Sequence, residues 1–398
     1  MTAQSAPRAD DRTSDTPGGL LPLLTAGMGL AMFVLFALGA LGPRLLGELE
    51  ISRSQLGTLT ALAFGTASVL SLYTGHLTDI LGGRRTLTAL LVTVAAAFTV
   101  LSLGGEYGWL LLALLLAGIA QAFANPATNR LIAVHLPPPR RAAAVGVKQS
   151  GVQIGAFAAG LLLPSLAAAL SWRTALALVV PVALAAAALA LRLPPDHPPA
   201  ERRAGGLLPA APNAPARWLI GYSFGVGTGL AALNTYLPLY AHEELGMGER
   251  ASGGLIAALG VAGIAARVLW TRHSGRVADI SVPLLVLAGV SVCLVLLLPA
   301  ATALTPLVWL GAVGLGGTAV AANAVSMVAV VRSPAFGATG HASALVSMGF
   351  FGGFVAGPLA FGLLADGPGG YQTGWGLVGA AFLASVLCGA RLRQVMRR

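Results

Sequence analysis

The sequence predicts an all-α membrane protein in which twelve transmembrane helices form two pseudo-symmetric bundles of six. Apolar runs follow one another almost from end to end, and about 20 consecutive apolar residues cross the hydrocarbon core of a bilayer as a helix. Hydrophobic residues make up 56% of the chain and charged residues 10%, against about a quarter charged in an ordinary soluble domain. With a mean hydropathy of +0.80, a soluble protein is excluded.

Charges, prolines and glycines break the apolar sequence into spans. The first follows a polar segment and ends at Pro43-Arg44 without a small-residue cleavage site, so we expect an uncleaved helix and not a signal peptide. The expected spans of the first half are 20–42, 54–75, 86–104, 109–133, 145–168 and 173–192. Those of the second half are 217–241, 252–271, 281–300, 305–331, 341–365 and 373–391.

A polar, proline-rich interval separates the two halves. It starts at Leu193, continues through Pro209, Pro212 and Pro215, and is the longest of its kind in the chain. Such a composition is typical of a linker. The expected units are a tail at 1–19, a six-helix bundle at 20–192, a linker at 193–216, a second six-helix bundle at 217–391 and a basic tail at 392–398.

Arginine is unevenly distributed between the two sides of the predicted bundles. With the amino terminus in the cytoplasm, the outer segments hold only Arg44, Arg53, Arg173 and Arg250. Because cytoplasmic loops carry the excess of Lys and Arg, we expect both termini to be cytoplasmic and the chain to lie in the cytoplasmic membrane of a prokaryote. The inner segments hold Arg84, Arg85, Arg140, Arg141, Arg192, Arg202, Arg203, Arg217, Arg272, Arg276, Arg332, Arg391, Arg393, Arg397 and Arg398.

The composition argues against several other classes of protein. The net charge of +10 comes from arginines at the ends of apolar runs and not from a basic stripe, so no nucleic-acid partner is expected. Cys293 and Cys388 lie inside apolar runs, which predicts neither a disulfide framework nor a metal site. The glycine-rich stretch from Gly311 has no strand before it and fails the context of a dinucleotide-binding loop. We therefore expect no enzyme, no catalytic residue and no cofactor.

One motif lies between the second and third expected spans, and part of it is repeated in the second half. It reads Gly75-His-Leu77-Thr-Asp79-Ile-Leu-Gly82-Gly-Arg84-Arg85, and the repeat is Gly275-Arg-Val-Ala-Asp279. At a shift of 198 residues Asn125 also falls on Asn323. A glycine permits close approach of helices, an aspartate is favourable beside a helix amino terminus, and arginines pair with acids or anionic lipid. The repetition indicates two copies of one membrane unit.

With these residues the chain resembles the major facilitator superfamily, whose loop between helices 2 and 3 carries this pattern. Gly75, Leu77, Asp79, Gly82 and Arg84 match the pattern, whereas Ile80 and Gly83 stand where basic residues are usual. The resemblance extends over essentially the whole chain. It implies that the motif, with Arg85 and the echo residues Gly275 and Asp279, acts as a gate on the cytoplasmic side. It also implies a substrate site near the midplane, lined by helices 1, 4, 7 and 10, with alternating access by rocking of the halves.

Polar side chains in three spans are the candidates for that site. Gln121, Asn125 and Asn129 follow one another every four residues and share one face of the fourth span. Asn323 is the repeat partner of Asn125 in the tenth span, and Asn234 lies in the seventh. Because polar groups in hydrocarbon are costly unless they face the protein or water, this face should look inward. Hydrogen bonds between helices and contacts with substrate are both compatible with it.

Basic and amide side chains near the cytoplasmic ends of other spans add further candidates. Lys148, the only lysine in the chain, lies with Gln149 and Gln153 at the start of the fifth span. Arg130 and Arg267 lie a turn or so from the inner ends of their spans. These cations either extend to the membrane interface or make the inner part of the cavity electropositive. No Asp or Glu falls in the middle of a span, which weakens a mechanism based on a buried carboxylate.

The sequence therefore predicts a secondary active transporter that moves a small polar or anionic solute by rocker-switch alternating access. Coupling to a proton or solute gradient would give the direction. The alternatives are a proton-coupled exporter of amphipathic drugs, for which Phe33 and Phe36 would supply an apolar cavity, and a non-transporting membrane sensor. The expected partners are the small-molecule substrate and the lipid bilayer, and we expect the monomer to be the functional unit.

Overall fold

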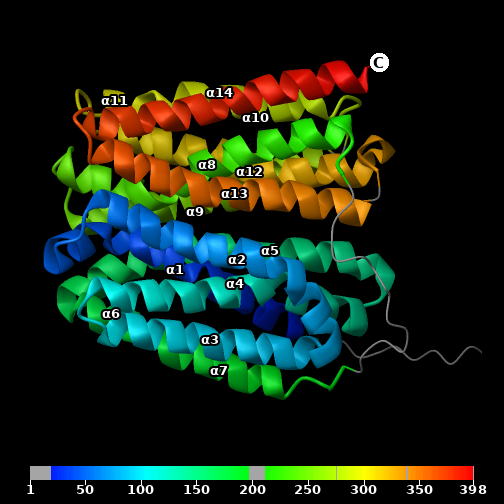
Figure 1. Cartoon of the computed structure of the whole chain (residues 1–398), viewed down its shortest axis with the longest axis horizontal. Helices are drawn as coiled ribbons and strands as arrows, with labels where there is room; N and C mark the ends of the chain where they lie inside the picture. Colours follow the sequence, from blue (N-terminus) through cyan, green and yellow to red (C-terminus); the bar gives the residue numbers. More distant parts are fainter. Residues whose placement is uncertain (1–18, 197–210, 275, 338, 398) are drawn as a thin grey trace, which may run out of the picture.

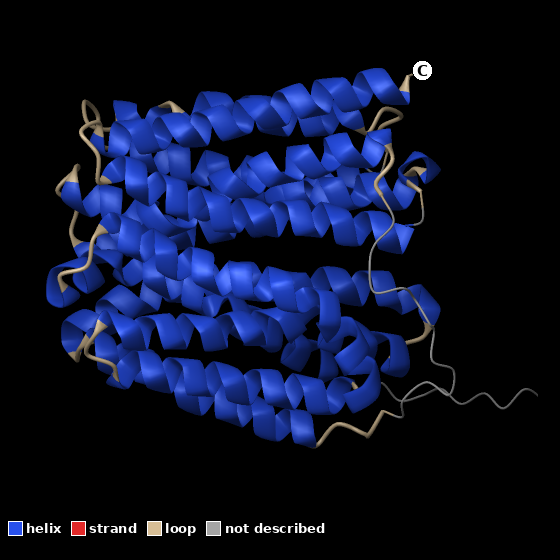
Figure 2. Ribbon diagram, in the orientation of Figure 1, coloured by secondary structure: helices blue, strands red, loops and turns tan. Residues whose placement is uncertain are grey.

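The structure is a computed structural model that describes residues 19–196, 211–274, 276–337 and 339–397. Within these ranges the chain forms helices joined by short loops and contains no strand. The loops gather at the two ends of the molecule, and long helices run between them (Figure 2). The prediction of an all-α fold is confirmed. Gly275 of the predicted gate lies outside the described residues.

The N-terminal bundle is built by helices that pack mainly on one another, with α1 against α5 and α4 between α2 and α3. Its helices are α1 (Leu20–Leu49), α2 (Arg53–Leu81), α3 (Gly83–Leu103), α4 (Tyr107–His135), α5 (Pro138–Ala169), α6 (Trp172–Ala177) and α7 (Val179–Leu191). Local signals fix several starts. The Ser52 hydroxyl accepts from the backbone N–H of Gln55 at 3.1 Å, and the Gln55 amide accepts from the Ser52 N–H at 2.7 Å, a reciprocal cap on α2.

The C-terminal bundle repeats this arrangement, with α8 packed against α13 and α14, and α9 against α12. Figure 1 shows the two bundles one above the other, with α8 to α14 in the upper half. The helices are α8 (Ala214–Glu243), α9 (Glu249–Ser274), α10 (Ser281–Val295), α11 (Leu297–Ala300), α12 (Leu307–Arg332), the 3-10 turn η1 (Pro334–Phe336), α13 (Thr339–Ala365) and α14 (Gly370–Met396).

The spans agree with the prediction of many membrane crossings, and the twelve-helix arrangement is consistent with them. Among the described residues ten helical segments are long and apolar enough to cross a bilayer, and an eleventh is α2, bent by 65° after Ser71. A further long helix, α8, is not among these segments, but with 30 residues, or about 45 Å at 1.5 Å per residue, it is long enough to cross a bilayer. Most of its residues from Tyr222 to Ala241 are buried in the interior of the molecule, and Gly, Ser, Thr and Tyr are among them.

Several helices differ in detail from the expected spans. The sixth is divided at Leu178 into α6 and α7, and the ninth at Leu296 into α10 and α11. Helix α5 begins at Pro138, seven residues earlier than expected, because proline is favourable in the first turn. Lys148 consequently lies almost three turns inside the helix. Of the two alternatives for this lysine, extension to the membrane interface disagrees with the structure, because the side chain is fully buried.

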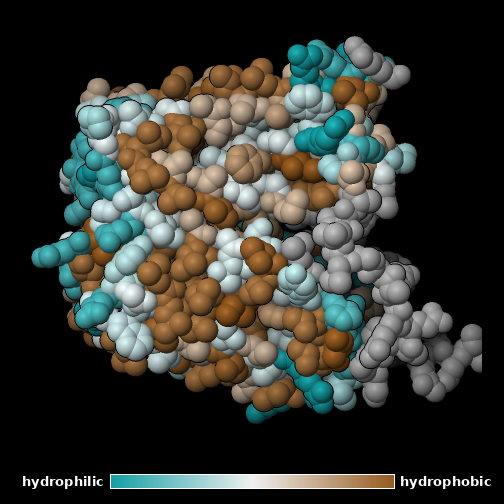
Figure 3. All heavy atoms as spheres, in the orientation of Figure 1, coloured by the Kyte–Doolittle hydropathy of each residue, from teal (hydrophilic) through white to brown (hydrophobic). Residues whose placement is uncertain are grey.

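The bundles meet mainly along three helix pairs, α2 with α13, α5 with α9, and α1 with α8. We call the end at which α1 begins and α14 ends the terminal end, and the opposite end the distal end. Hydrophobic atoms cover the middle of the face shown in Figure 3, and hydrophilic atoms gather toward both ends. This distribution suits a bilayer whose normal runs along the helices.

Candidate functional site

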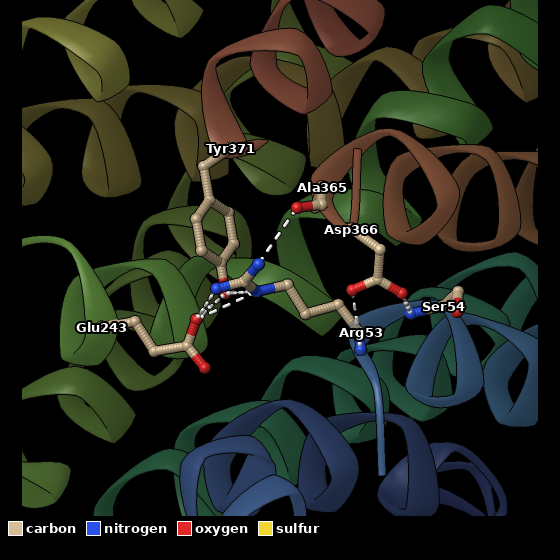
Figure 4. Close-up of polar contacts among 6 residues, drawn as sticks. All are labelled: Arg53, Ser54, Glu243, Ala365, Asp366 and Tyr371. Atoms are coloured by element: carbon tan, nitrogen blue, oxygen red, sulfur yellow. Dashed lines mark hydrogen bonds and ion pairs between the residues drawn. The ribbon is translucent and has the colours of Figure 1, made fainter. Parts of the chain in front are cut away.

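Polar contacts join the bundles at the distal end, where Arg53 at the start of α2 reaches the other bundle (Figure 4). Its guanidinium donates to Glu243 at 2.6 and 3.0 Å and to the carbonyl of Ala365 at 3.0 Å. The Tyr371 hydroxyl also donates to Glu243, at 2.8 Å, and the Arg53 guanidinium lies 4.7 Å from the centre of the Tyr371 ring. The sequence had marked Arg53 only as one of four outer arginines, since its partners lie 190 and 318 residues away.

A carboxylate from the other bundle completes the start of α2. Asp366, just after α13, accepts from the backbone N–H of Ser54 at 2.9 Å and of Arg53 at 3.3 Å. The first N–H groups of a helix have no partner within it and favour negative charge. Nearby, Arg44 of α1 donates to Glu249 of α9 at 2.5 Å. We call Arg53, Glu243, Asp366, Tyr371 and the Arg44–Glu249 pair the distal gate.

Below the distal gate the backbones of the two bundles touch. A methyl group on Gly39 of α1 would lie 1.9 Å from the carbonyl oxygen of Asn234 in α8, and one on Gly57 would lie 2.2 Å from that of Pro358. Side chains other than hydrogen do not fit such approaches. Phe64 of α2 continues the contact at mid-depth, with its ring centre 4.7 Å from that of Phe354. The interface is therefore closed from the distal end to its middle.

Lys148 is the centre of a polar cluster between α4 and α5. Its side chain is fully buried, and Nζ donates to the Thr128 hydroxyl at 2.6 Å and to the amide oxygen of Asn125 at 3.1 Å. The same Asn125 oxygen accepts from Nε2 of Gln149 at 3.1 Å. Three predicted site residues are thus brought together. Thr128 was missed because a threonine in a span usually bonds its own helix, which this one does as well, to Ala124 at 2.6 Å.

Arg267 of α9 lies at the same depth as this cluster, across the interface. Helices α5 and α9 run antiparallel, and Gly160 of α5 faces Gly253 of α9. Seven residues closer to the terminal end on both helices, Gln153 of α5 faces Gly260 of α9. Another seven residues lead to Gly146 on α5 and Arg267 on α9, within a turn of Lys148 and Gln149. Arg267 is partly exposed, and its buried Nε has no hydrogen-bond partner among the described residues.

The remaining candidates occupy other depths. Gln121 borders a cavity of about 10 Å³ between α1, α2 and α4, next to Phe64. Asn234 lies in the distal half, where its Nδ2 donates to Leu230 and the side chain is buried away from the Lys148 cluster. Asn323 is half-buried on α12 and Asn129 is exposed on α4. Buried side-chain oxygens of Gln121, Gln153 and Asn234 have no partner in the described part of the chain.

The gate motif forms a different assembly, at the terminal end. Arg130 of α4 donates to Asp79 at 2.8 Å and to Asp196, beyond α7, at 2.7 Å. Asp196 also accepts from the backbone N–H groups of Gly83 at 2.6 Å and Arg84 at 3.1 Å, at the start of α3. Burial alone would raise the pKa of Asp196, but these bonds hold it below its ordinary value. Arg130 is paired with carboxylates and does not serve the basic cluster.

Other motif residues surround this assembly. Gly82 has a positive φ of 84°, and a methyl group there would lie 2.9 Å from the Asp196 carboxylate. The Arg84 guanidinium donates to the carbonyl of Leu193 at 3.2 Å. Leu77 and Arg85 are exposed. A cavity of about 400 Å³ opens beside the motif, and its lining residues are Gly75, Thr78, Asp79, Pro126, Asn129, Arg130, Ala133 and Val134.

In the second half Asp279 alone serves the start of α10. It accepts from the backbone N–H of Ser281 at 3.1 Å and from the Ser281 hydroxyl. Arg393 of α14 and Arg397, just after that helix, pair with its other oxygen at 2.9 and 3.4 Å. Burial would raise the pKa of Asp279, but the hydrogen bonds of Ser281 and Arg393 hold it below its ordinary value. The repeated aspartate therefore keeps a helix-start role in the C-terminal bundle.

Comparisons with known proteins agree with this architecture. The family model of the Major Facilitator Superfamily matches residues 24–339. The probable nitrate/nitrite transporter NarK2 of Mycobacterium tuberculosis is 28% identical over 285 residues, 68% of each chain. The hexuronate transporter of Bacillus subtilis is 24% identical over 163 residues, 41% of this chain and 38% of that one.

Solved structures share the fold at low sequence identity. A bacterial homologue of the human lysosomal transporter Spinster, in an inward-facing and unoccupied conformation, has a TM-score of 0.74 at 17% identity, over 98% of each chain. A mutant of the nucleoside transporter NupG has a TM-score of 0.75 at 16% identity, over 94% of this chain and 99% of that one. The chain belongs to the major facilitator superfamily and is a secondary transporter, not an enzyme.

Proposed function

We propose that this transporter carries a small anion and binds it at the level of Asn125, Gln149, Lys148 and Arg267. One observation carries the proposal: two basic side chains lie at one depth of the molecule, and neither pairs with a carboxylate of the described residues. Buried charges are normally paired. An anionic solute would supply the missing counter-charge, and the amides would add neutral hydrogen bonds.

The comparisons support an anion as the substrate class. The relatives include a probable nitrate/nitrite transporter and hexuronate transporters, together with the probable anion transporter 5 of Arabidopsis thaliana, which is 30% identical over 117 residues. Nitrate and hexuronates are both small and negatively charged. A drug exporter finds less support, because Phe64, Phe350 and Phe354 are buried against one another and close the interface instead of lining a cavity.

We also propose that both termini lie in the cytoplasm, in the cytoplasmic membrane of a prokaryote, because arginine is concentrated at the terminal end. The distal end is then extracellular, and the structure is closed to the outside. Transport would require the distal gate to open and the two bundles to approach each other at the terminal end. The motif around Asp79 would then be the inner gate. We expect the monomer to suffice, with no nucleic-acid partner and no resident cofactor.

The anion proposal can be tested with purified protein in liposomes. Counterflow of labelled nitrate, a labelled hexuronate, a neutral sugar and a cationic dye would be compared. We expect flux of at least one anion, and a loss of about tenfold or more in Arg267→Gln, because a charge-assisted hydrogen bond contributes about 1.5 to 3 kcal/mol. Arg272→Gln, an exposed arginine on the same helix, should retain wild-type flux. Flux of the dye or sugar alone, or an unaffected Arg267→Gln, would contradict the proposal.

A further inference from the structure

The immediate partners of Lys148 are two neutral oxygen acceptors. The Thr128 hydroxyl lies 2.6 Å from the carbonyl of Ala124, so its own proton is directed there and its oxygen is free to accept from Nζ. The amide oxygen of Asn125 is the second acceptor, at 3.1 Å. The side chain has no exposed surface, and no carboxylate of the described residues pairs with it.

This geometry matches an amine better than an ammonium. A neutral amine has two N–H donors and one lone pair, whereas an ammonium has three donors. Two acceptors satisfy both donors of the amine, and the third donor of an ammonium would have no acceptor among the described residues. A buried donor without a partner and a buried charge without a counter-ion both cost free energy. The ammonium form is therefore fully partnered only when a negative group arrives together with the proton.

The charged groups on the neighbouring helices do not supply that negative group. On α4, Arg130 is held by Asp79 and Asp196. On α5 itself, Arg141 donates to backbone carbonyls of the α4 end. Helix α1 has no titratable side chain before Arg44, which is at the distal end. Across the interface α9 offers Arg267, a second cation.

We propose that Lys148 binds the proton that travels with the anion, so that the chain is a proton–anion symporter without an intramembrane carboxylate. The inference rests on the proposed function. A proton from water at the open end adds to the lone pair of Nζ and forms the third N–H bond. That N–H donates to the anion beside Asn125 and Gln149, whose half-buried amides are hydrogen-bonded to each other. At the other side of the membrane the anion leaves and the proton returns to water.

Coupling follows from linkage between the two ligands. If a bound anion stabilises the ammonium, protonation must strengthen anion binding by the same factor. No Asp or Glu lies in the middle of a span to carry a proton. Lys148 takes this role instead, and its protonated form is positively charged. For a monovalent anion the step moves no net charge. Flux should then respond to a pH gradient and be insensitive to membrane potential.

The test measures anion and proton flux in the same liposomes. Labelled nitrate and a labelled hexuronate are the probes, and a pH-sensitive dye inside the vesicles reports protons. We expect lumenal acidification that depends on the anion, one proton for each monovalent anion, unchanged by a valinomycin-imposed potential. Anion flux without acidification overturns the inference alone. Absence of flux for both anions overturns the proposed function, and the inference with it.

Two variants and a control locate the proton on Lys148. Lys148→Arg keeps a permanent charge and Lys148→Gln removes it, so both should exchange anion at equal pH, although more weakly, and lose acidification by about tenfold or more. Ser150→Ala, whose hydroxyl bonds only the carbonyl of Val147 on the same helix, should behave as wild type. Proton flux preserved in either Lys148 variant overturns the inference. If Lys148→Gln does not elute as a single species, Lys148→Arg decides.

Discussion

At the distal end Arg53 and Asp366 bond across the interface between the bundles, whereas at the terminal end Arg130 and Asp196 bond within the N-terminal half and its linker. At the same end Arg393 bonds to Asp279 and Arg332 bonds to the carbonyl of Ser274, both inside the C-terminal bundle. Polar groups of similar chemistry are thus used for two purposes. At one end they hold the halves together, and at the other they hold each half in shape.

The difference indicates which contacts change during transport. If the bundles move as rigid bodies, the distal bonds must break and the terminal assemblies move intact. The close backbone contacts at Gly39 and Gly57 belong to the distal set as well, since each joins one bundle to the other. Substitutions at the distal end should therefore alter the equilibrium between conformations, and substitutions in the terminal assemblies should alter the stability of one half.

The largest effect is expected at Gly39. In Gly39→Ala the new methyl group would lie 1.9 Å from the carbonyl oxygen of Asn234, a backbone atom that cannot turn away. The distal end could not close, and we expect transport to fall by at least about tenfold. In a variant without cysteines, spin labels at positions 50 and 244, one in each bundle at the distal end, should move apart by several ångströms as measured by pulsed electron resonance.

Gly47→Ala is the matched control for this contact. Gly47 lies on the same helix, and a methyl group there would meet nothing within 4 Å. Both variants add the same group to α1, so any effect of helix propensity is shared. Equal transport in the two variants would show that the α1–α8 contact is not needed for closure.

The next effect separates the two helix-start aspartates. The Asp196 side chain is 2% exposed and pairs with Arg130, while that of Asp279 is 33% exposed. Breaking a buried pair costs on the order of 3 kcal/mol and breaking an exposed one below about 1 kcal/mol. Asp196→Asn should lower the thermal unfolding temperature in detergent well below that of Asp279→Asn. Equal decreases would contradict the distinction.

The same variants have an expected pH dependence. The pKa of Asp196 is lower in the folded chain than its ordinary value. Its contribution to the free energy of unfolding is therefore complete above the ordinary carboxyl pKa of about 4. The contribution is lost as the pH falls through the lower pKa of the folded chain. The difference between wild type and Asp196→Asn should be constant from pH 7 to pH 5 and should decrease below about pH 4.

Most of the fold could be predicted from the sequence because its signals are local. Apolar length, arginine asymmetry and the motif from Gly75 to Arg85 each lie in short stretches, and the family match confirms the architecture they indicated. The Lys148 cluster was partly predictable as well. Helix periodicity placed Asn125 inward, and the single lysine was conspicuous, but the meeting of the two helices was not encoded in either one. The roles of these side chains in binding remain predictions.

What the sequence could not reveal depends on contacts between distant segments. Asp196 stands in a proline-rich interval that looked like a bare linker, and nothing local connects it to the start of α3, 112 residues earlier. Asn234 looked like a cavity residue because it is polar and lies in the seventh span. The absence of a side chain on Gly39 brings α1 so close that Asn234 is enclosed.

Arg53 should produce the smallest of the three effects. Its side chain is 30% exposed and that of Glu243 is 27% exposed, so water screens the pair. Arg53→Ala also removes the bonds to Tyr371 and Ala365, and we expect about 1 to 2 kcal/mol less free energy in favour of the closed distal end, or a shift of about tenfold in the ratio of the two conformations. The spin-label distances used for Gly39 would measure this ratio.

Arg250→Ala is the control, because Arg250 is an exposed arginine at the same end that bonds no described residue, and it should leave the distances unchanged. Since Asp366 still holds the start of α2 through Ser54, the closed form should persist as a substantial fraction, and its complete loss would mean that Arg53 alone keeps the distal end shut.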